Sequence, residues 1–338
     1  MITALLSLYS AGILMTNDVQ PNTPHLMPWD ANQIIENAQI PKKNPLNIAP
    51  VIKAKAAIAV DLKNGYVLFE KDIHDPLPIA SLTKLMTEII VLEENNLTDV
   101  VKVSKAASKT DGSKIWLAPD EKITVENLLY AALIPSANDA AMALAEYNGD
   151  SIPSFVAKMN KKAEELGMVS TYFVNPTGLR EDGSSSEEDE TTDAPKETTS
   201  ITEQLTEQLQ NKPIDLLEPV KIVKPRENFS TAYDLTLLAR YAYGKSFIRR
   251  AAVKKEMEIE STNGSLTHKL KNTNELLSSY LKVLGLKTGT TDEAGECLIS
   301  IIENDDGHQI LTVVLNSPAR YTETKVLADW VFRTYSWN

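Results

Sequence analysis

Alternating apolar and polar positions first appear at residues 54–61 and return at 66–70. Asn64 and Gly65 lie between the two runs. This dipeptide between alternating runs is typical of a β-hairpin, because both residues accept the positive φ that a tight hairpin turn requires. The pattern therefore predicts two paired strands at the start of the folded part of the chain.

Helical periodicity dominates the middle of the chain. A run rich in Leu, Met and Glu opens at Ser81, continues over 82–95 and ends at two asparagines. Apolar helical stretches at 125–134 and 140–147 flank Pro135 and Ser136. Residues 99–170 therefore predict mainly helices with short strands.

Strand patterns return towards the C-terminus. They occupy 283–286, which we expect to end at Lys287, and then 296–302 and 309–315 on either side of an Asp-Asp-Gly turn. A final amphipathic helix is predicted over 321–335. Its expected apolar side consists of Val326, Leu327, Trp330, Val331 and Phe332. Together the elements predict an α/β (α+β) fold with an antiparallel sheet flanked by helices and a helical subdomain.

Three segments depart from this pattern. The apolar run at 2–15 is too short for a confident membrane span and has no Lys or Arg before it, so 1–15 is a candidate signal or anchor segment, with a buried irregular segment as the alternative. Residues 16–50 contain six prolines and predict a linker. Residues 182–225 predict an acidic, disordered insertion in the domain at 51–338, because so few apolar side chains cannot offset the entropy of ordering.

Charge and composition exclude several classes of protein. Residues 181–218 carry a net charge of −10 of the chain's −12, so the rest is nearly neutral and no basic patch suggests nucleic acid. One cysteine, Cys297, rules out an internal disulfide, and its apolar strand setting favours a buried side chain over a reactive thiol. We expect no metal and no cofactor, because the four histidines show no ligand spacing. They are His25, His74, His268 and His308.

Three short motifs carry the chemistry. In chain order they are Ser81-Leu-Thr-Lys84, Ser136-Ala-Asn138 and Lys287-Thr-Gly289. Alone, Ser81 reads as a helix N-cap and Lys287 as a strand end. The chain also holds a second Ser-x-x-Lys at 279–282, in a loop before a strand, and a second Ser-x-Asn at 261–263, in a turn. Order and secondary structure distinguish the three motifs from these copies.

The motifs together provide the groups for acyl transfer. Ser81 and Lys84 are spaced i, i+3 on a helix, which places their side chains on one face. A lysine activates a serine only when it is neutral, so we expect burial and the charge of Lys287 to lower the pKa of Lys84. Ser136 supplies a proton relay. Asn138 is expected to hold Lys84 on one side and a substrate peptide on the other.

Five blocks of the chain resemble a known family. Residues 79–87, 135–140, 173–179, 230–235 and 285–291 with 294–298 resemble, in order, the motif blocks of the D-alanyl-D-alanine carboxypeptidases, the low-molecular-mass penicillin-binding proteins of serine peptidase family S11. The resemblance implies a β-lactamase/transpeptidase-like fold. It also implies removal of the terminal D-alanine from peptidoglycan stem peptides through an acyl-Ser81 intermediate, in cell-wall biogenesis and cell shape.

The resemblance also assigns roles to individual residues. It implies Ser81 as nucleophile, Lys84 as base, and Ser136 and Asn138 as relay and positioning groups. The oxyanion hole would consist of the N–H groups of Ser81 and Thr290. The groups expected to bind the substrate, including its terminal carboxylate, are Lys287, Thr288, Gly289 and Arg320; Gly289 is expected to let the peptide approach as an extra strand.

The expected partners are stem peptides ending in D-Ala-D-Ala and β-lactams as covalent inhibitors, with no nucleic acid. We expect an extracytoplasmic protein, secreted or attached to the membrane at its N-terminus. Two alternatives stay open: a DD-endopeptidase of the same family, and a non-catalytic peptidoglycan-binding protein. A class A β-lactamase is disfavoured, because Glu164-Glu-Leu-Gly167 does not match the deacylating glutamate motif.

Overall fold

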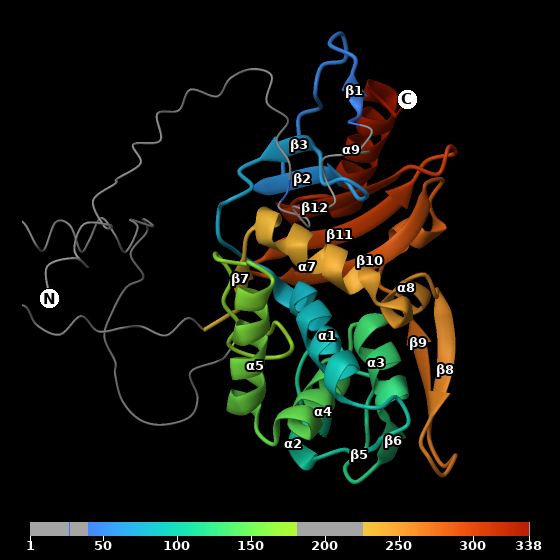
Figure 1. Ribbon diagram of the computed structural model, residues 1–338. Helices are drawn as coiled ribbons and strands as arrows, with labels where there is room; N and C mark the ends of the chain where they lie inside the picture. The colour runs from blue at the N-terminus through green and yellow to red at the C-terminus, as the bar shows by residue number, and fades with distance from the viewer. Residues whose placement is uncertain (1–26, 28–39, 181–225, 338) are drawn as a thin grey trace, which may run out of the picture.

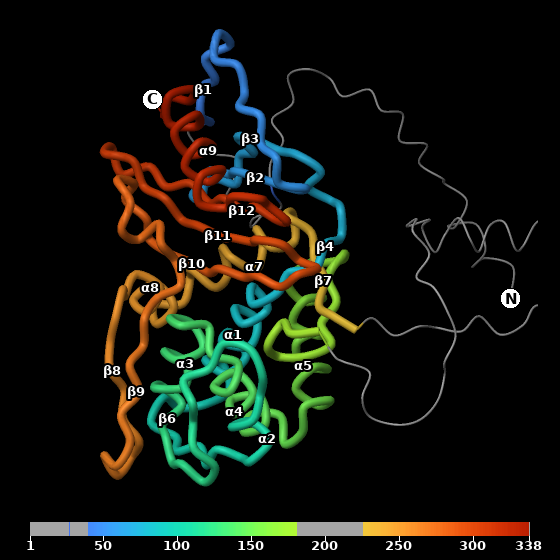
Figure 2. Tube along the Cα trace, turned by 180° about the vertical axis from the view of Figure 1, so that it is seen from behind, coloured from blue at the N-terminus to red at the C-terminus, as the bar shows by residue number. Residues whose placement is uncertain are grey.

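The computed structural model describes Met27 and residues 40–180 and 226–337, shown from opposite sides in Figures 1 and 2. The candidate signal segment 1–15 and the predicted insertion 182–225 lie outside the described residues. Of the predicted linker 16–50, the structure describes Met27, which is buried, and residues 40–50. Within the latter, β1 (Lys42–Lys43) pairs with β13 (Tyr335–Ser336).

A five-stranded antiparallel sheet forms the upper layer in Figure 1. The Asn64-Gly65 hairpin is confirmed, because the strands on either side of it pair antiparallel, with one irregularity between Ala59 and Val60. Strands from both ends of the chain meet at the centre of this sheet. In spatial order the strands are β10 (Lys282–Thr291), β11 (Gly295–Glu303), β12 (Gln309–Ser317), β2 (Ala56–Asp61) and β3 (Val67–Lys71).

Both faces of the sheet are covered, and the side chains of its strands alternate between them. On β2, Ala57 and Ala59 pack with the C-terminal helix α9 (Arg320–Thr334). Ile58 and Val60 point to the opposite core, which the other helices share. The predicted C-terminal helix is confirmed, but Val326 is 41% exposed and lies outside its apolar face.

The helical subdomain lies below the sheet in Figure 1 and confirms the expectation for 99–170. Its three longer helices after α1 pack against α1, which carries Lys84 of the first motif, and the short helix at 105–108 packs against the helix at 138–149. Its members are α1 (Lys84–Glu94), α2 (Lys105–Ser108), α3 (Val125–Leu133), α4 (Asn138–Gly149) and α5 (Ile152–Glu165), with the hairpin β5 (Val100–Lys102) and β6 (Lys122–Thr124).

The remaining elements connect the subdomain to the sheet. The hairpin predicted around Ser261–Asn263 joins β8 to β9 and is confirmed. The elements are β4 (Leu77–Pro78), the 3₁₀ turn η1 (Ala80–Thr83), β7 (Phe229–Ser230), α7 (Ala232–Gly244), α8 (Ser246–Ala252), β8 (Glu256–Glu260), β9 (Thr267–Lys271) and the 3₁₀ turn η3 (Glu275–Ser278).

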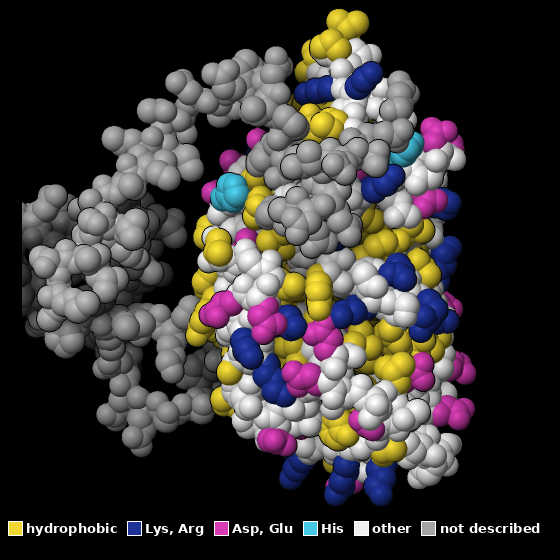
Figure 3. Space-filling view, viewed as in Figure 1, with side chains coloured by type: hydrophobic (Ala, Val, Ile, Leu, Met, Phe, Trp, Pro, Cys, Tyr) yellow, Lys and Arg dark blue, Asp and Glu magenta, His cyan; other side chains and the backbone are white. Residues whose placement is uncertain are grey.

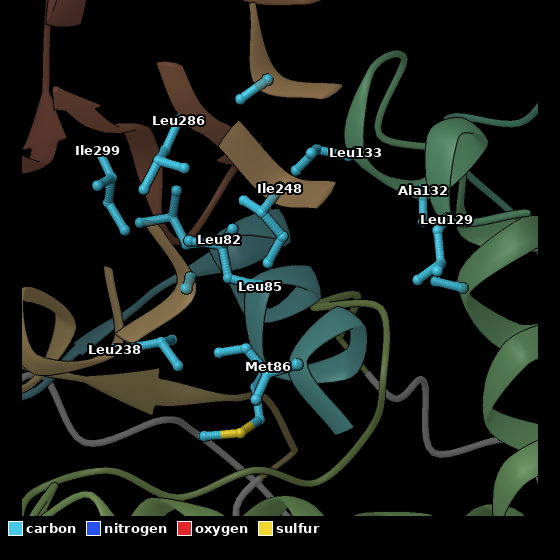
Figure 4. Packing of buried hydrophobic residues seen from close by; sticks show 14 of the residues in the cluster. Leu82, Leu85, Met86, Leu129, Ala132, Leu133, Leu238, Ile248, Leu286 and Ile299 are labelled. Carbon is cyan, nitrogen blue, oxygen red and sulfur yellow. The ribbon is translucent and has the colours of Figure 1, made fainter. Parts of the chain in front are cut away.

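Helix α1 passes through the junction between the two parts. Figure 4 shows Leu82, Leu85 and Met86 among side chains from the sheet, such as Leu286, and from the neighbouring helices, such as Ile248. Burying one such side chain stabilises the fold by about 1.5–3 kcal/mol. This packing fixes the start of α1 against β10.

The strand that carries the third motif is longer than predicted. We expected it to end at Lys287, but β10 continues to Thr291 and pairs with β11 over its whole length, with one irregularity between Val283 and Gly285. The polar residues Lys287 and Thr288 are 1% and 4% exposed. Lys287 contacts Ser136 of the helical subdomain, and Thr288, on the other face of the strand, contacts Thr273. The polar side chains of Lys287 and Thr288 therefore belong to a buried site inside the strand and do not mark the end of the strand.

Candidate active site

Ser81 lies in the 3₁₀ turn η1, immediately before α1, and is partly exposed. Ala80 before it has a φ of 45°, a left-handed conformation that is costly for any residue other than glycine. Two glycines let other backbones reach this turn. A Cβ on Gly178 would lie 2.0 Å from the Ala80 carbonyl oxygen, and one on Gly289 would lie 3.1 Å from the Ser81 amide nitrogen. The nucleophile turn is therefore held between two backbone segments.

Gly289 has a role that we did not predict, and the approach of a substrate strand beside it stays a prediction. We expected the missing side chain to make room for a substrate strand. In the structure, the chain's own turn takes that space, because the atoms nearest to an added Cβ would belong to Ile79, Ala80 and Ser81. The glycine thus brings β10 close to the nucleophile.

Lys84 is fully buried one turn after Ser81. Its Nζ is 2.8 Å from Ser81 Oγ and 2.8 Å from the Thr177 carbonyl oxygen. Burial lowers the pKa of Lys84 well below its usual value, and the charge of Lys287 lowers it further, while Glu88 and Asp139 oppose the shift. A neutral amine here can donate to Thr177 and accept the proton of Ser81 with its lone pair.

Our sequence reasoning missed the Thr177 carbonyl. It is a backbone atom, positioned by two buried asparagines. Asn175 Oδ1 accepts from the N–H groups of Thr177 and Gly178, at 3.2 and 2.8 Å. Asn228 Nδ2 donates to the Asn175 carbonyl and to Thr83 Oγ1, at 2.9 and 2.8 Å. Asn228 therefore ties the loop that holds Lys84 to the start of α1. The Asn-Pro-Thr-Gly run at 175–178 was the feature of the sequence that could have indicated this loop.

Ser136 and Lys287 form a second pair. Lys287 Nζ donates to Ser136 Oγ at 2.7 Å and to the Thr288 carbonyl at 2.9 Å. Burial lowers the pKa of Lys287 to about 7; Glu88 opposes the shift and Arg320 adds to it. Ser136 is 5% exposed and has a φ of 63°. Strained backbone of this kind is often held in place at functional sites.

The expected contact between Asn138 and Lys84 does not form. Asn138 Nδ2 donates to the Asp111 carbonyl at 2.7 Å, and its buried Oδ1 has no hydrogen-bond partner among the described residues. Instead, Lys84 donates to the Thr177 carbonyl. A buried acceptor without a partner is costly, so this amide oxygen is a candidate acceptor for a ligand N–H group.

The remaining predicted residues lie along the end of β10. Thr288 Oγ1 is 2.6 Å from Thr273 Oγ1. Arg320, at the start of α9, donates from Nη1 to the Gly289 carbonyl at 2.9 Å and to Thr290 Oγ1. The structure thus places a guanidinium and a hydroxyl group beside the strand that passes Ser81.

Other features of the described residues bear on the site. Cys297 is buried, and burial raises the pKa of its thiol to about 11. Within 40–180 and 226–337, no group of three or more His, Cys, Asp or Glu side chains could hold a metal ion. No helix in these ranges is both long and apolar enough to cross a membrane. On the face drawn in Figure 3, basic and acidic side chains are intermixed rather than separated by sign.

Comparison with known proteins gives a family and a fold. The peptidase S11 family model, described as D-alanyl-D-alanine carboxypeptidase, matches residues 43–319. The D-alanyl-D-alanine carboxypeptidase DacF of Bacillus subtilis is 30% identical over 84% of this chain, and DacC of Escherichia coli is 32% identical over 85%. The chain spans 63% of the length of each of these two relatives.

One solved structure matches this chain over nearly its own full length. The Streptomyces K15 DD-transpeptidase superposes with a TM-score of 0.68 at 28% identity, over 85% of this chain and 99% of that one. The transpeptidase-like fold expected from the sequence is thereby confirmed.

Proposed function

Since the chain belongs to the D-alanyl-D-alanine carboxypeptidase family, peptidase S11, we propose that it is a serine carboxypeptidase that removes the terminal D-alanine from peptidoglycan stem peptides. The observation that carries this proposal is the contact of 2.8 Å between Ser81 Oγ and a fully buried Lys84. A serine in contact with a lysine whose burial favours the neutral amine is an activated nucleophile.

In the first step, Lys84 Nζ takes the proton of Ser81 as Oγ attacks the carbonyl carbon between the two D-alanines. The resulting oxyanion lies between the N–H groups of Ser81 and Thr290. Such donors stabilise the charge that develops in the transition state, and the N-terminus of α1 adds to their effect. Collapse of the intermediate breaks the C–N bond, and the leaving D-alanine amine receives a proton through Ser136.

The terminal carboxylate binds at the end of β10. Lys287 supplies a positive charge, Thr288 a hydroxyl group, and Arg320 a guanidinium beside Gly289 and Thr290. Asn138 Oδ1, which lacks a partner in the described part of the chain, accepts an N–H group of the peptide. Water then hydrolyses the acyl-Ser81 ester, with Lys84 as the base.

Intact mass after brief incubation with benzylpenicillin tests the proposal. We expect one penicilloyl adduct on wild type and none on Ser81→Ala, because β-lactams acylate the same nucleophile. Release of D-alanine from a synthetic peptide ending in D-Ala-D-Ala then establishes turnover. A folded wild type with neither adduct nor release would favour the non-catalytic peptidoglycan-binding protein.

A second candidate function rests on a relative. The D-alanyl-D-alanine endopeptidase of Pseudomonas aeruginosa is 27% identical over 85% of this chain. The same acyl transfer would then cut a cross-link between two stem peptides. Incubation with a cross-linked dimer separates the two activities, because an endopeptidase yields two monomers and a carboxypeptidase releases only free D-alanine.

These substrates place the protein outside the cytoplasm, in the cell envelope. We propose that it is secreted or attached to the membrane through its N-terminal segment. Fractionation of cells that express the full chain, with and without residues 1–15, tests the attachment. Loss of the protein from the membrane fraction upon deletion is the expected result.

A further inference from the structure

Glu88 is a buried carboxyl group that the chemistry above does not use. It lies one helical turn after Lys84 on α1 and is 0% exposed. Neither Oε1 nor Oε2 has a hydrogen-bond partner among the described residues. A buried carboxyl without a partner is costly, so its presence requires a physical reason.

The two buried lysines provide that reason. Lys84 donates to Ser81 Oγ and the Thr177 carbonyl, and Lys287 donates to Ser136 Oγ and the Thr288 carbonyl. All four acceptors are uncharged oxygen atoms. Two amines at 0% and 1% exposure therefore lie in one site without a carboxylate of the described chain in hydrogen-bond contact. A buried positive charge in such a site needs a compensating negative charge nearby.

Two carboxyl groups interact electrostatically with these lysines, Glu88 with both and Asp139 with Lys84. Both carboxylate oxygens of Asp139 on α4 already accept hydrogen bonds. Its Oδ1 accepts from the N–H groups of Ile115 and Ala140, and its Oδ2 from that of Leu117. Of these two carboxyl groups, Glu88 is the one with uncommitted oxygens.

Several other charged groups on the elements packed against α1 interact with groups outside the site. On α7, Asp234 accepts from Thr171 and the Ser170 N–H. On α5, Lys158 and Lys162 pair with Glu94 and Glu93, at the far end of α1. On α3, Glu126 interacts with Tyr130. The described groups that act on the site are Lys84 on α1, Lys287 on β10, Asp139 on α4 and Arg320 on α9.

We propose that Glu88 is the buried counter-charge of the site, a positioning residue that sets the protonation of Lys84 and Lys287 without touching the substrate. In its ionised form, Glu88 makes Lys84 a stronger base and keeps Lys287 charged for carboxylate binding. Burial raises the pKa of Glu88 well above its usual value, and the two lysines act in the opposite direction. The inference rests on the proposed function, because it assigns the two lysines their roles in acylation.

The test is the rate of acylation by benzylpenicillin as a function of pH, for wild type and Glu88→Gln. The acid limb follows deprotonation of Lys84, and the alkaline limb follows loss of charge on Lys287. Removing a nearby negative charge lowers both lysine pKa values, so both limbs should move to lower pH by about one unit. On the alkaline side the variant should then be about tenfold slower than wild type, while on the acid side the difference shrinks or reverses.

Controls separate this role from a structural one. Glu93→Gln removes a charge from the same helix, but that carboxylate pairs with Lys162 and Lys245 and does not contribute to the pKa shift of either active-site lysine, so both limbs should stay in place. Glu88→Asp keeps the charge and should restore the wild-type limbs. A uniformly lower rate with unmoved limbs in Glu88→Gln would mean that Glu88 only packs, and would overturn the inference.

Two further outcomes are decisive. If Glu88→Gln does not fold, as judged by its thermal melt, Glu88→Leu carries the same prediction, because it is also neutral and similar in volume. If wild type forms an adduct but neither neutral variant moves the limbs, only the inference fails. If folded wild type forms no adduct, the proposed function fails and the inference fails with it.

Discussion

The substitution Gly178→Ala tests whether the Ala80–Ser81 turn must keep its position for acylation. Gly178 has a φ of 84°, and an added Cβ would lie 2.0 Å from the Ala80 carbonyl oxygen and 2.3 Å from its carbonyl carbon. Ordinary contact begins at 3.4 Å, so the two backbones must separate by about 1.4 Å. The displaced residue directly precedes the nucleophile.

The expected loss has two parts. A left-handed φ with a side chain costs about 1–2 kcal/mol of stability. A displacement of about 1 Å at a reacting group can reduce the rate by about 100-fold. We therefore expect Gly178→Ala to lose both stability and at least about 100-fold in the rate of acylation.

Gly167→Ala is the matched control. Gly167 has a φ of 74°, and an added Cβ would have no described atom within 4 Å. It should lose only the cost of the left-handed φ, about 1–2 kcal/mol in urea unfolding, and acylate at the wild-type rate. The reasoning is refuted if Gly178→Ala, folded at the assay temperature, acylates within about threefold of Gly167→Ala.

Two other predictions follow from burial. Lys287, whose pKa is lowered to about 7, is charged below that pH and neutral above it. The value of kcat/KM for a D-Ala-D-Ala peptide should therefore fall about tenfold per pH unit above pH 7. A pH series of kcat/KM measures this fall, and a flat profile up to pH 9 contradicts the prediction. Cys297, buried and with its pKa raised to about 11, should resist a thiol reagent in the native protein and take up one equivalent in urea; rapid labelling of the native protein would show that the site opens.

Local patterns predicted the parts of the fold and site that depend on neighbouring residues. The Asn64-Gly65 hairpin needs only a turn and two alternating runs. The contact between Ser81 and Lys84 follows from their spacing at the start of one helix. Both are present in the structure.

Patterns failed where a long-range contact decides the environment. Lys287 and Thr288 looked like the end of a strand because polar side chains usually face solvent, yet both are buried by contacts with residues distant in sequence, Lys287 with Ser136 and Thr288 with Thr273. The acceptor for Lys84 is the Thr177 carbonyl, and a carbonyl has no signature in the sequence. Its position depends on Asn228, which is distant along the chain and follows no periodicity. We assigned the contact with Lys84 to Asn138 because the sequence shows side chains and not the positions of backbone carbonyls.

The strand order of the sheet has a consequence for how the protein comes to be folded. The sheet pairs β2 with β12, so β2 can complete this pairing only after β12 has been synthesised. The helices from 84 to 165 make contacts among themselves over short distances in sequence, and contacts of that kind form fast. The helical subdomain can therefore form early in synthesis. Ser81 then meets Lys287 and Gly289 only after β10, β11 and β12 have emerged, so a partly made chain has a nucleophile but no site in which it can react.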